Sequence, residues 1–260
     1  MIKTFVISLD RCSDRRKLIF ENLKKVGFVD NVEWFKAIDG KNDDLSQYDI
    51  DRSKFKRYWH NKISCCSSNL YFSDSEYACT LSHLHIYKKI VDENIPMALV
   101  LEDDVILNAK YQDSLNNLES IVKKFSCELL YLLCFERFKT RFKEQETGFN
   151  TKIRRIGMGG VDWFFNRRRN VCCNGAYVIT NEACKKLLKI AYPVKAQSDV
   201  FLGMLAYNKL KAYKFIPLIA DHNFQLPSTI LHAGDMDINE KPWYSKLFKK
   251  IKSLYHKDYK

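Results

Sequence analysis

The sequence predicts an α/β fold, in which one domain with a sheet flanked by helices is followed by an amphipathic C-terminal helix. The chain has 260 residues, of which 46% are hydrophobic and 28% charged, which is enough for one packed domain. Short apolar runs alternate with segments of helical periodicity, as in α/β proteins. Because the composition changes only near the end, we place the main domain at residues 1–235 and a basic tail at residues 236–260.

The chain opens with a strand, a helix and a second strand. Residues 5–9 are a short apolar run ended by polar residues, which is typical of a buried strand. Ser13 or Asp14 can cap a helix that runs to about Val26. Residues 32–38 predict a second strand, stopped by an Asp-Gly turn. This β-α-β order favours parallel pairing of the two strands.

A longer helix and a central strand come next, after a polar, weakly periodic stretch at residues 41–72. Ser73 and Glu76 have the spacing of a capping box, and the helix that they begin ends near Asn94. The apolar face of this helix consists of Tyr77, Leu81, Leu84 and Ile90. Residues 97–101 are a continuous apolar run, typical of a central strand.

The alternation continues to residue 219. We predict helices at residues 111–125, 182–190 and 199–210, and strands at residues 129–135, 176–179 and 212–219. Residues 139–170 are dense in Arg and Lys and include Gly157, Gly159 and Gly160. Because long loops in compact domains are usually functional or disordered, we interpret this segment as a long, mobile active-site loop.

The formal net charge of +12 predicts an acidic partner. Nucleic acid, an anionic membrane and phosphorylated small molecules all fit that charge. The basic residues concentrate in residues 139–169 and in the last twenty, without a regular stripe or a nucleic-acid motif. We therefore expect no nucleic acid partner, and keep a basic nucleic-acid- or anion-binding module without turnover as the alternative.

The cysteines and the N-terminus point to the cytoplasm. Nine cysteines include no C-x-x-C pair, so we expect free thiols in a reducing compartment. The first apolar stretch is too short for a signal peptide, and no run of about 18 apolar residues predicts a membrane span.

Three consecutive acids follow the predicted central strand: Glu102, Asp103 and Asp104. Ligands of open α/β sheets bind beyond the carboxyl ends of the strands. Buried carboxylates require solvent, partners or a metal, and Mn²⁺ or Mg²⁺ takes oxygen ligands while leaving positions for phosphate. Such a cation would assist the departure of a diphosphate. The alternatives are a solvated acidic cluster and a Mg²⁺ phosphohydrolase, although the spacing of a two-metal or aspartyl-nucleophile site is not evident.

The acidic triplet belongs to an ordered set of segments that resembles glycosyltransferase family 25, the lipooligosaccharide galactosyltransferases and related enzymes. The matching segments are residues 5–11 (FVISLDR) with 14–16 (DRR), 37–40 (AIDG), 76–83 (EYACTLSH), 98–105 (ALVLEDDV) and 175–179 (GAYVI). Each is modest alone, but the ordered set is fairly specific and extends over most of residues 1–180.

The resemblance implies a GT-A-like fold, that is, a Rossmann-type mixed sheet flanked by helices. It also implies an inverting transfer from a UDP-sugar with Mn²⁺ or Mg²⁺. UDP-galactose is the commonest donor among bacterial relatives, and UDP-glucose or another UDP-sugar is the alternative. The implied acceptor is a lipid-linked oligosaccharide, a lipooligosaccharide or lipopolysaccharide. By this likeness Asp104 is the direct metal ligand, Asp103 holds the ribose or a metal-bound water, and Glu102 supports them at the metal.

Other residues are candidates for donor binding. Ser8, Leu9 and Asp10 end the first strand where uridine could lie. Arg11, Arg15 and Arg16 open the next helix and can clamp phosphate, with a solvated helix start as the alternative. The full set of predicted donor-binding residues is Ser8, Leu9, Asp10, Arg11, Arg16, Ser82, His83, Asp103 and Gly175. A core role is the alternative for His83, which falls in mid-helix.

An inverting transfer requires a general base, and Asp199 is our candidate. The alternative for Asp199 is charge stabilisation of a helix N-terminus, and Asp162 is a weaker candidate base. Many GT-A enzymes recruit a late histidine to the metal, which makes His222 a third candidate metal ligand.

The tail predicts a basic amphipathic helix. Trp243, Leu247, Ile251 and Leu254 share one face, and lysines fill much of the rest. We expect this helix to bind an anionic membrane surface, with the protein cytoplasmic and peripheral on the inner face of the bacterial inner membrane. The alternative is packing on its own domain or on a twin subunit in a homodimer.

Overall fold

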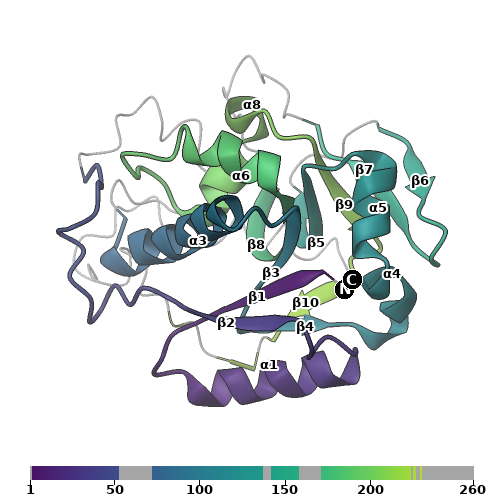
Figure 1. Ribbon diagram of the computed structural model, residues 1–260, viewed down its shortest axis with the longest axis horizontal. Helices are drawn as coiled ribbons and strands as arrows, with labels where there is room; N and C mark the ends of the chain where they lie inside the picture. Colours follow the sequence, from purple (N-terminus) through teal and green to yellow (C-terminus); the bar gives the residue numbers. More distant parts are fainter. Residues whose placement is uncertain are drawn as a thin grey trace, which may run out of the picture.

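The computed structural model describes residues 2–52, 72–136, 142–157, 171–223, 225, 226 and 229. It contains an eight-stranded mixed sheet with the strand order β2-β1-β3-β8-β5-β9-β7-β6 (Figure 1). These strands are β1 (Lys3–Ser8), β2 (Val32–Lys36), β3 (Met97–Glu102), β5 (Leu129–Glu136), β6 (Glu144–Glu146), β7 (Lys152–Arg155), β8 (Val171–Thr180) and β9 (Ala212–Ile216). A second, two-stranded ribbon pairs β4 (Val105–Leu107) with β10 (Ala220–His222).

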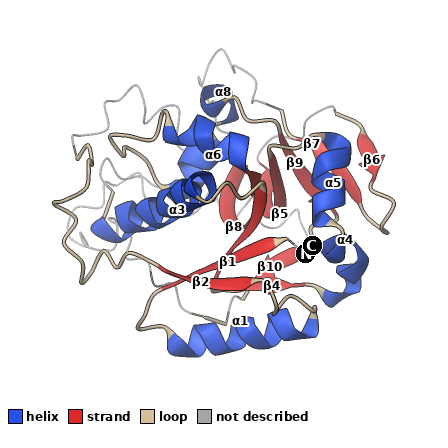
Figure 2. Ribbon diagram, in the orientation of Figure 1, coloured by secondary structure: helices blue, strands red, loops and turns tan. Residues whose placement is uncertain are grey.

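Helices cover both faces of the sheet, which confirms the predicted α/β fold (Figure 2). They are α1 (Ser13–Lys25), α3 (Asp74–Asp92), α4 (Gln112–Asn116), α5 (Leu118–Phe125), α6 (Asn181–Leu188), α7 (Ser198–Gly203) and α8 (Leu205–Asn208), with a 3-10 turn η1 at Ala109–Tyr111. Alternate strand residues enter two cores, because successive side chains of a strand point to opposite faces. Phe5 and Val100 pack with α3 and α6, whereas Val6 and Leu99 pack with α1, α4 and α5.

The start of α3 forms as predicted. Ser73 Oγ accepts a hydrogen bond from the Glu76 amide at 3.2 Å, and Glu76 Oε2 accepts one from the Ser73 amide at 2.7 Å. This capping box satisfies two backbone N–H groups of the first turn. The four apolar residues predicted for one face of this helix are all buried.

The start of α1 differs from the prediction. Cys12 occupies the N-cap position, and no side chain caps the helix, so Ser13 and Asp14 already lie inside it. Of the four apolar residues that the sequence places on one face of this helix, Ile19, Leu23 and Val26 are buried, whereas Leu18 is 45% exposed.

The interpretation of residues 139–170 as one long loop is wrong for its described part. Strands β6 and β7 form an antiparallel hairpin, and β7 pairs with β9 at the end of the sheet. Only Ile153 on β7 is an apolar residue buried in the core, flanked by Lys and Arg, so the sequence gives a weak strand signal there.

Two further elements are shorter than predicted. The helix expected at residues 199–210 is divided at Met204 into α7 and α8. The strand expected at residues 212–219 is β9 alone, and β10 follows it in the separate ribbon. Asp162 and the tail at residues 236–260 lie outside the described residues. In the described part of the chain, no helix is long and apolar enough to cross a bilayer.

The candidate site lies at one edge of the sheet. Strands β1, β2 and β3 run parallel, so their carboxyl ends meet at that edge. Strand β8 is antiparallel to both β3 and β5, which brings its amino end and the carboxyl end of β5 to the same edge.

Candidate functional site

A cleft opens at this edge of the sheet. Its lining residues come from the ends of β1, β2 and β3, from α1 and from one side of α3: Ile7, Ser8, Leu9, Arg11, Arg15, Ala37, Ile38, Asp39, Gly40, Ser75, Cys79, Ser82, His83, Glu102, Asp103, Asp104 and Thr229. The predicted donor-binding residues Ser8, Leu9, Arg11, Ser82, His83 and Asp103 are therefore brought together. This is the position at which open α/β sheets bind ligands.

Arg15 is the cationic partner of the acidic triplet. It is 8% exposed, and its Nε lies 2.9 Å from Asp103 Oδ1, while its Nη2 lies 2.7 Å from Asp104 Oδ2. Its Nη1 donates to Thr229 Oγ1 at 3.2 Å. One guanidinium thus offsets part of the repulsion between two adjacent carboxylates.

The two aspartates have different protonation properties. Burial raises the pKa of Asp103 to about 6, although Arg15 and the Ser8 hydroxyl act in the opposite direction. Burial also acts to raise the pKa of Asp104, but the His222 imidazole and Arg15 outweigh it and lower this pKa. Asp104 therefore ionises more readily than Asp103, which suits a ligand for a hard cation.

His222 reaches Asp104 through the β4–β10 ribbon. Its backbone is in register with Val105, and the Asn223 amide donates to the Asp104 carbonyl at 2.7 Å. The ring Nδ1 lies 3.8 Å from Asp104 Oδ1. Asp104, and to a lesser extent Cys173, raises the pKa of His222 to about 10 against the effect of burial.

The Asp104–His222 pair fits a divalent cation. Among the described residues, Asp104 Oδ1 is buried and has no hydrogen-bond partner. A carboxylate oxygen and an imidazole nitrogen are suitable ligands for a first-row divalent cation such as Mn²⁺.

Glu102 has a different environment from Asp104. Its Oε1 lies 3.2 Å from His83 Nε2, and His83 Nδ1 lies 2.7 Å from the Tyr177 hydroxyl. The Tyr177 hydroxyl is also 2.8 Å from that of Tyr87. His83 is 1% exposed, so it links a cleft carboxylate to two buried tyrosines.

The ligand atoms of Cys79, His83 and Glu102 lie within 4.8 Å of one another, which is close enough for a second metal set. Burial and the charge of Glu102 raise the pKa of the Cys79 thiol. Because a neutral thiol is a poor ligand for Mn²⁺ or Mg²⁺, this set fits a hard cation less well than Asp104 and His222.

Several predicted donor-binding residues contact protein groups. The Arg16 guanidinium donates to the carbonyls of Leu9 and Asp10, at 2.5 and 2.9 Å. Asp10 is exposed and pairs with Lys36 at 2.7 Å, and neither Asp10 nor Arg16 is part of the cleft lining. Arg16 thus orders the loop that follows β1.

Arg11 and Ser82 do line the cleft, and they connect its walls. Arg11 Nε donates to Asp39 Oδ2 at 2.7 Å, which lowers the pKa of Asp39. Ser82 Oγ accepts from the Ile38 amide at 2.9 Å, which joins the end of the second strand to α3. Gly40 allows this approach, since a Cβ there would lie 2.3 Å from the Asp74 carbonyl oxygen.

Asp199 lies in the first turn of α7 and is partly buried. Its neighbour Ser198 contacts Cys79, with Oγ and Sγ 3.4 Å apart, and the charge of Asp199 contributes to the raised pKa of that thiol. This places Asp199 on the α3 side of the site, although it is not one of the residues that line the cleft.

Sequence reasoning missed the residues that hold the predicted ones. The sequence predicts Arg15 as a phosphate clamp or as part of a solvated helix start, and it assigns no role to Cys173, Tyr177 or Thr229. Gly175 was selected for donor binding, but a Cβ there would lie 3.2 Å from His222 Cε1, so it provides room for that ring. A signal for these contacts is the VCCNG run at residues 171–175. Its glycine and asparagine lie within a strand, which is typical of a bulge or of a site that another group approaches closely.

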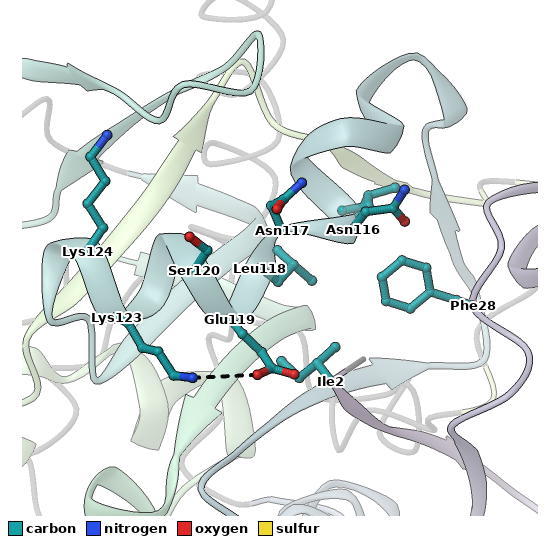
Figure 3. A pocket seen from close by; sticks show the side chains of 10 residues that line it. Ile2, Phe28, Asn116, Asn117, Leu118, Glu119, Ser120, Lys123 and Lys124 are labelled. Atoms are coloured by element: carbon teal, nitrogen blue, oxygen red, sulfur yellow. Dashed lines mark ion pairs between the residues drawn. The ribbon is translucent and has the colours of Figure 1, made fainter.

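A second hollow lies at the opposite end of the parallel strands (Figure 3). Ile2 and Phe28, which precede β1 and β2, line it together with Asn116, Asn117 and Lys123. The charged residues in it include a Lys123–Glu119 ion pair at 3.8 Å. Because it faces the amino ends of these strands, it is a poor candidate for the donor site.

Comparisons with known proteins find a family model and several relatives that are similar to this chain. The family model "Glycosyltransferase family 25 (LPS biosynthesis protein)" matches residues 1–202. A "Procollagen lysyl hydroxylase and glycosyltransferase" of Acanthamoeba polyphaga mimivirus is 30% identical over 73% of this chain and 20% of its own length. The mouse "Procollagen galactosyltransferase 2" is 28% identical over 79% of this chain and 30% of its own length.

A bacterial relative is also similar. The "Lipooligosaccharide biosynthesis protein lex-1" of Haemophilus influenzae is 25% identical over 52% of this chain and 43% of its own length. The chain thus matches less than half the length of each of these three relatives. Among solved structures, a UDP-glucose pyrophosphorylase complexed with UDP-glucose is similar with a TM-score of 0.40 and 14% identity, covering 83% of this chain and 91% of the other.

Proposed function

Because this chain belongs to glycosyltransferase family 25, we propose that it transfers galactose from UDP-galactose, with inversion to a β linkage, to a lipooligosaccharide or lipopolysaccharide acceptor. The family description names lipopolysaccharide biosynthesis, and the names of two relatives specify lipooligosaccharide biosynthesis and galactose transfer. The observation that carries the proposal is the pairing of Asp104 with His222 at the end of β3.

Asp104 and His222 would hold a divalent cation, Mn²⁺ or Mg²⁺. The support is their donor chemistry and the Asp104 Oδ1 atom, which is buried without a hydrogen-bond partner among the described residues. When bound, the cation supplies Lewis-acid stabilisation of the diphosphate leaving group. Glu102, which contacts His83 instead, would support the acidic cluster from the α3 side.

The remaining cleft residues would bind and orient the donor. Ser8 and Leu9 end β1 beside Asp103, at the position proposed for the uridine. Arg11 lies in the same cleft and can hydrogen-bond phosphate through its guanidinium. Arg15 holds Asp103 and Asp104 in place, so that the acids are oriented before the donor binds.

Asp199 is the proposed general base, which would take the proton from the attacking acceptor hydroxyl. Its position near Cys79, on the α3 side of the cleft, supports this role.

We test the function with the purified full chain and a panel of UDP-sugars in Mn²⁺, measuring released UDP. The panel contains UDP-galactose, UDP-glucose and UDP-N-acetylglucosamine, each with and without a galactose- or glucose-terminated acceptor. UDP-galactose should give the most acceptor-dependent UDP, and EDTA should abolish its release. If no donor releases UDP while oligonucleotides bind in a salt-sensitive way, the chain is an anion-binding module instead.

Membrane attachment is a separate proposal, since the tail at residues 236–260 lies outside the described part of the chain. The support is its basic amphipathic sequence, which suits a peripheral position on the inner face of the inner membrane. Deleting the residues after Lys241 should release the protein from anionic vesicles. Unchanged vesicle binding would contradict the proposal, and a change from dimer to monomer on deletion would favour tail packing between subunits.

A further inference from the structure

Strand β8 bulges where it reaches the site. Its register pairs Leu133 with Ala176 and Phe135 with Cys172. A step of two residues along β5 therefore corresponds to a step of four residues along β8. The additional β8 residues lie among Cys173, Asn174 and Gly175. Bulges commonly redirect side chains next to functional sites.

The backbone of Cys173 is unusual within this bulge. Its φ of 73° lies in the left-handed region, which non-glycine residues rarely adopt. Such conformations are energetically unfavourable and persist where the surroundings hold them.

The bulge contacts both histidines of the site. Cys173 Sγ lies 3.1 Å from His222 Nε2, and Asn174 Nδ2 lies 3.4 Å from His83 Nε2. The His222 ring is also stacked on Phe135, with centroids 6.4 Å apart and an interplanar angle of 19°. Gly175 leaves room at the ring edge, where a Cβ would lie 3.2 Å from Cε1. His222 is therefore held by a sulfur, an aromatic ring and a glycine.

We propose that Cys173 is a positioning residue for His222, whose Nε2–H donates to the Cys173 sulfur so that Nδ1 faces Asp104. The inference rests on the proposed metal-binding role of Asp104 and His222. A metal-ligating histidine usually donates its second ring N–H to a neighbouring acceptor, which fixes the tautomer and the ring orientation. Here the acceptor is a thiol sulfur, supplied by the bulge.

The geometry distinguishes Cys173 from its neighbour Cys172. The bulge and the positive φ of Cys173 interrupt the regular alternation of side chains here, so the contact with His222 itself separates the two cysteines. The two cysteines have the same chemistry and similar partial exposure, and the Cys173 sulfur is the one that lies 3.1 Å from His222 Nε2. Cys172 is therefore a matched control.

The experiment measures Mn²⁺ affinity of the full chain by calorimetry, without donor or acceptor. Cys173→Ala should weaken Mn²⁺ binding about 10-fold, the lower end of the range for the loss of such a partner. Cys173→Ser should recover part of the affinity, because the hydroxyl can also accept the hydrogen bond. Cys172→Ala should bind Mn²⁺ as the wild type does. Excess Mn²⁺ should restore the transfer rate of Cys173→Ala, as expected of a residue that acts through the metal site.

Two further variants make the result decisive. Cys173→Gly also removes the sulfur and suits a positive φ, so it replaces Cys173→Ala if that variant does not fold. His222→Ala tests the premise and should lose most Mn²⁺ affinity. If His222→Ala loses affinity while Cys173→Ala and Cys173→Gly keep it, the positioning role is wrong and the metal site stands. If His222→Ala itself binds Mn²⁺ normally, the metal assignment on which the inference rests is wrong.

Discussion

The two sides of β3 contribute different parts of the site. The parallel strands β1, β2 and β3 supply its charged groups at their carboxyl ends, where Asp103 and Asp104 meet Arg15 of the adjacent helix. The antiparallel neighbour β8 and the ribbon strand β10 supply Cys173, Tyr177 and His222, which orient or complete that charge. The charged groups thus come from local motifs, whereas their orientation depends on strands distant in sequence.

The largest expected effect is on the parallel side, where Asp104→Ala should remove the proposed metal ligand. We expect transfer to fall at least about 1,000-fold, since Lewis-acid stabilisation supplies several kcal/mol. The fold should remain, which circular dichroism checks. Transfer within a few-fold of the wild type would mean that Asp104 is not the metal ligand.

The next effect concerns the proposed general base, which the substitution Asp199→Asn removes. Loss of a general base should lower kcat about 100-fold or more, with Mn²⁺ and UDP affinities unchanged. Asp113→Asn is the matched control, because Asp113 occupies the first turn of α4 and is not one of the residues that line the cleft. Equal, small effects of both variants on kcat would indicate that Asp199 stabilises the N-terminus of its helix and is not the general base.

Arg15→Met addresses the charge balance of the parallel side. Removing the guanidinium takes the cationic partner away from the buried carboxylates of Asp103 and Asp104. This should lower the free energy of unfolding by about 3 kcal/mol. Urea denaturation measures the loss. Arg16→Met is the control and should cost less, because Arg16 is more exposed and, among the described residues, donates to two backbone carbonyls rather than to a buried carboxylate. A larger loss for Arg16→Met would reverse this interpretation.

Tyr177→Phe tests the support that the antiparallel side gives to His83. The variant leaves His83 Nδ1 and the Tyr87 hydroxyl without their shared partner, which should cost about 1–3 kcal/mol of unfolding free energy. Tyr87→Phe should cost less, because the Tyr177 hydroxyl keeps its contact with His83. Thermal unfolding of both variants makes the comparison, and equal losses would show that the contact with His83 adds nothing.

The smallest effect concerns the partly exposed Arg11–Asp39 pair at the ends of β1 and β2. Asp39→Asn should cost at most about 1 kcal/mol at neutral pH, because water screens the pair. The folded state lowers the pKa of Asp39, so its stabilisation is present above the ordinary aspartate value of about 3.9. The difference between wild type and variant should therefore stay constant from about pH 7 to 5 and vanish as the pH falls through the lowered pKa. A difference that persists at about pH 2 would point to packing instead.

Sequence reasoning worked best where the signals were local. The capping box of Ser73 and Glu76 and the apolar run before Glu102 each lie within a few residues, and both form as predicted. It was least reliable in the described part of residues 139–170, where the β6–β7 hairpin depends on pairing with β9. A strand of this kind is stabilised by its partner strand, so the sequence of a polar edge hairpin shows little of the apolar alternation that predicts a strand.

The sequence by itself determined the α/β alternation, the acids at the end of β3 and the family, because apolar periodicity and short motifs persist within local segments. Only the tertiary structure decided that His222 lies beside Asp104, that Arg15 holds both aspartates, and that a bulge brings Cys173 against the His222 ring. These contacts join residues dozens to more than a hundred positions apart or depend on the register of β8. Register is set by the pairing of whole strands, which no single segment encodes.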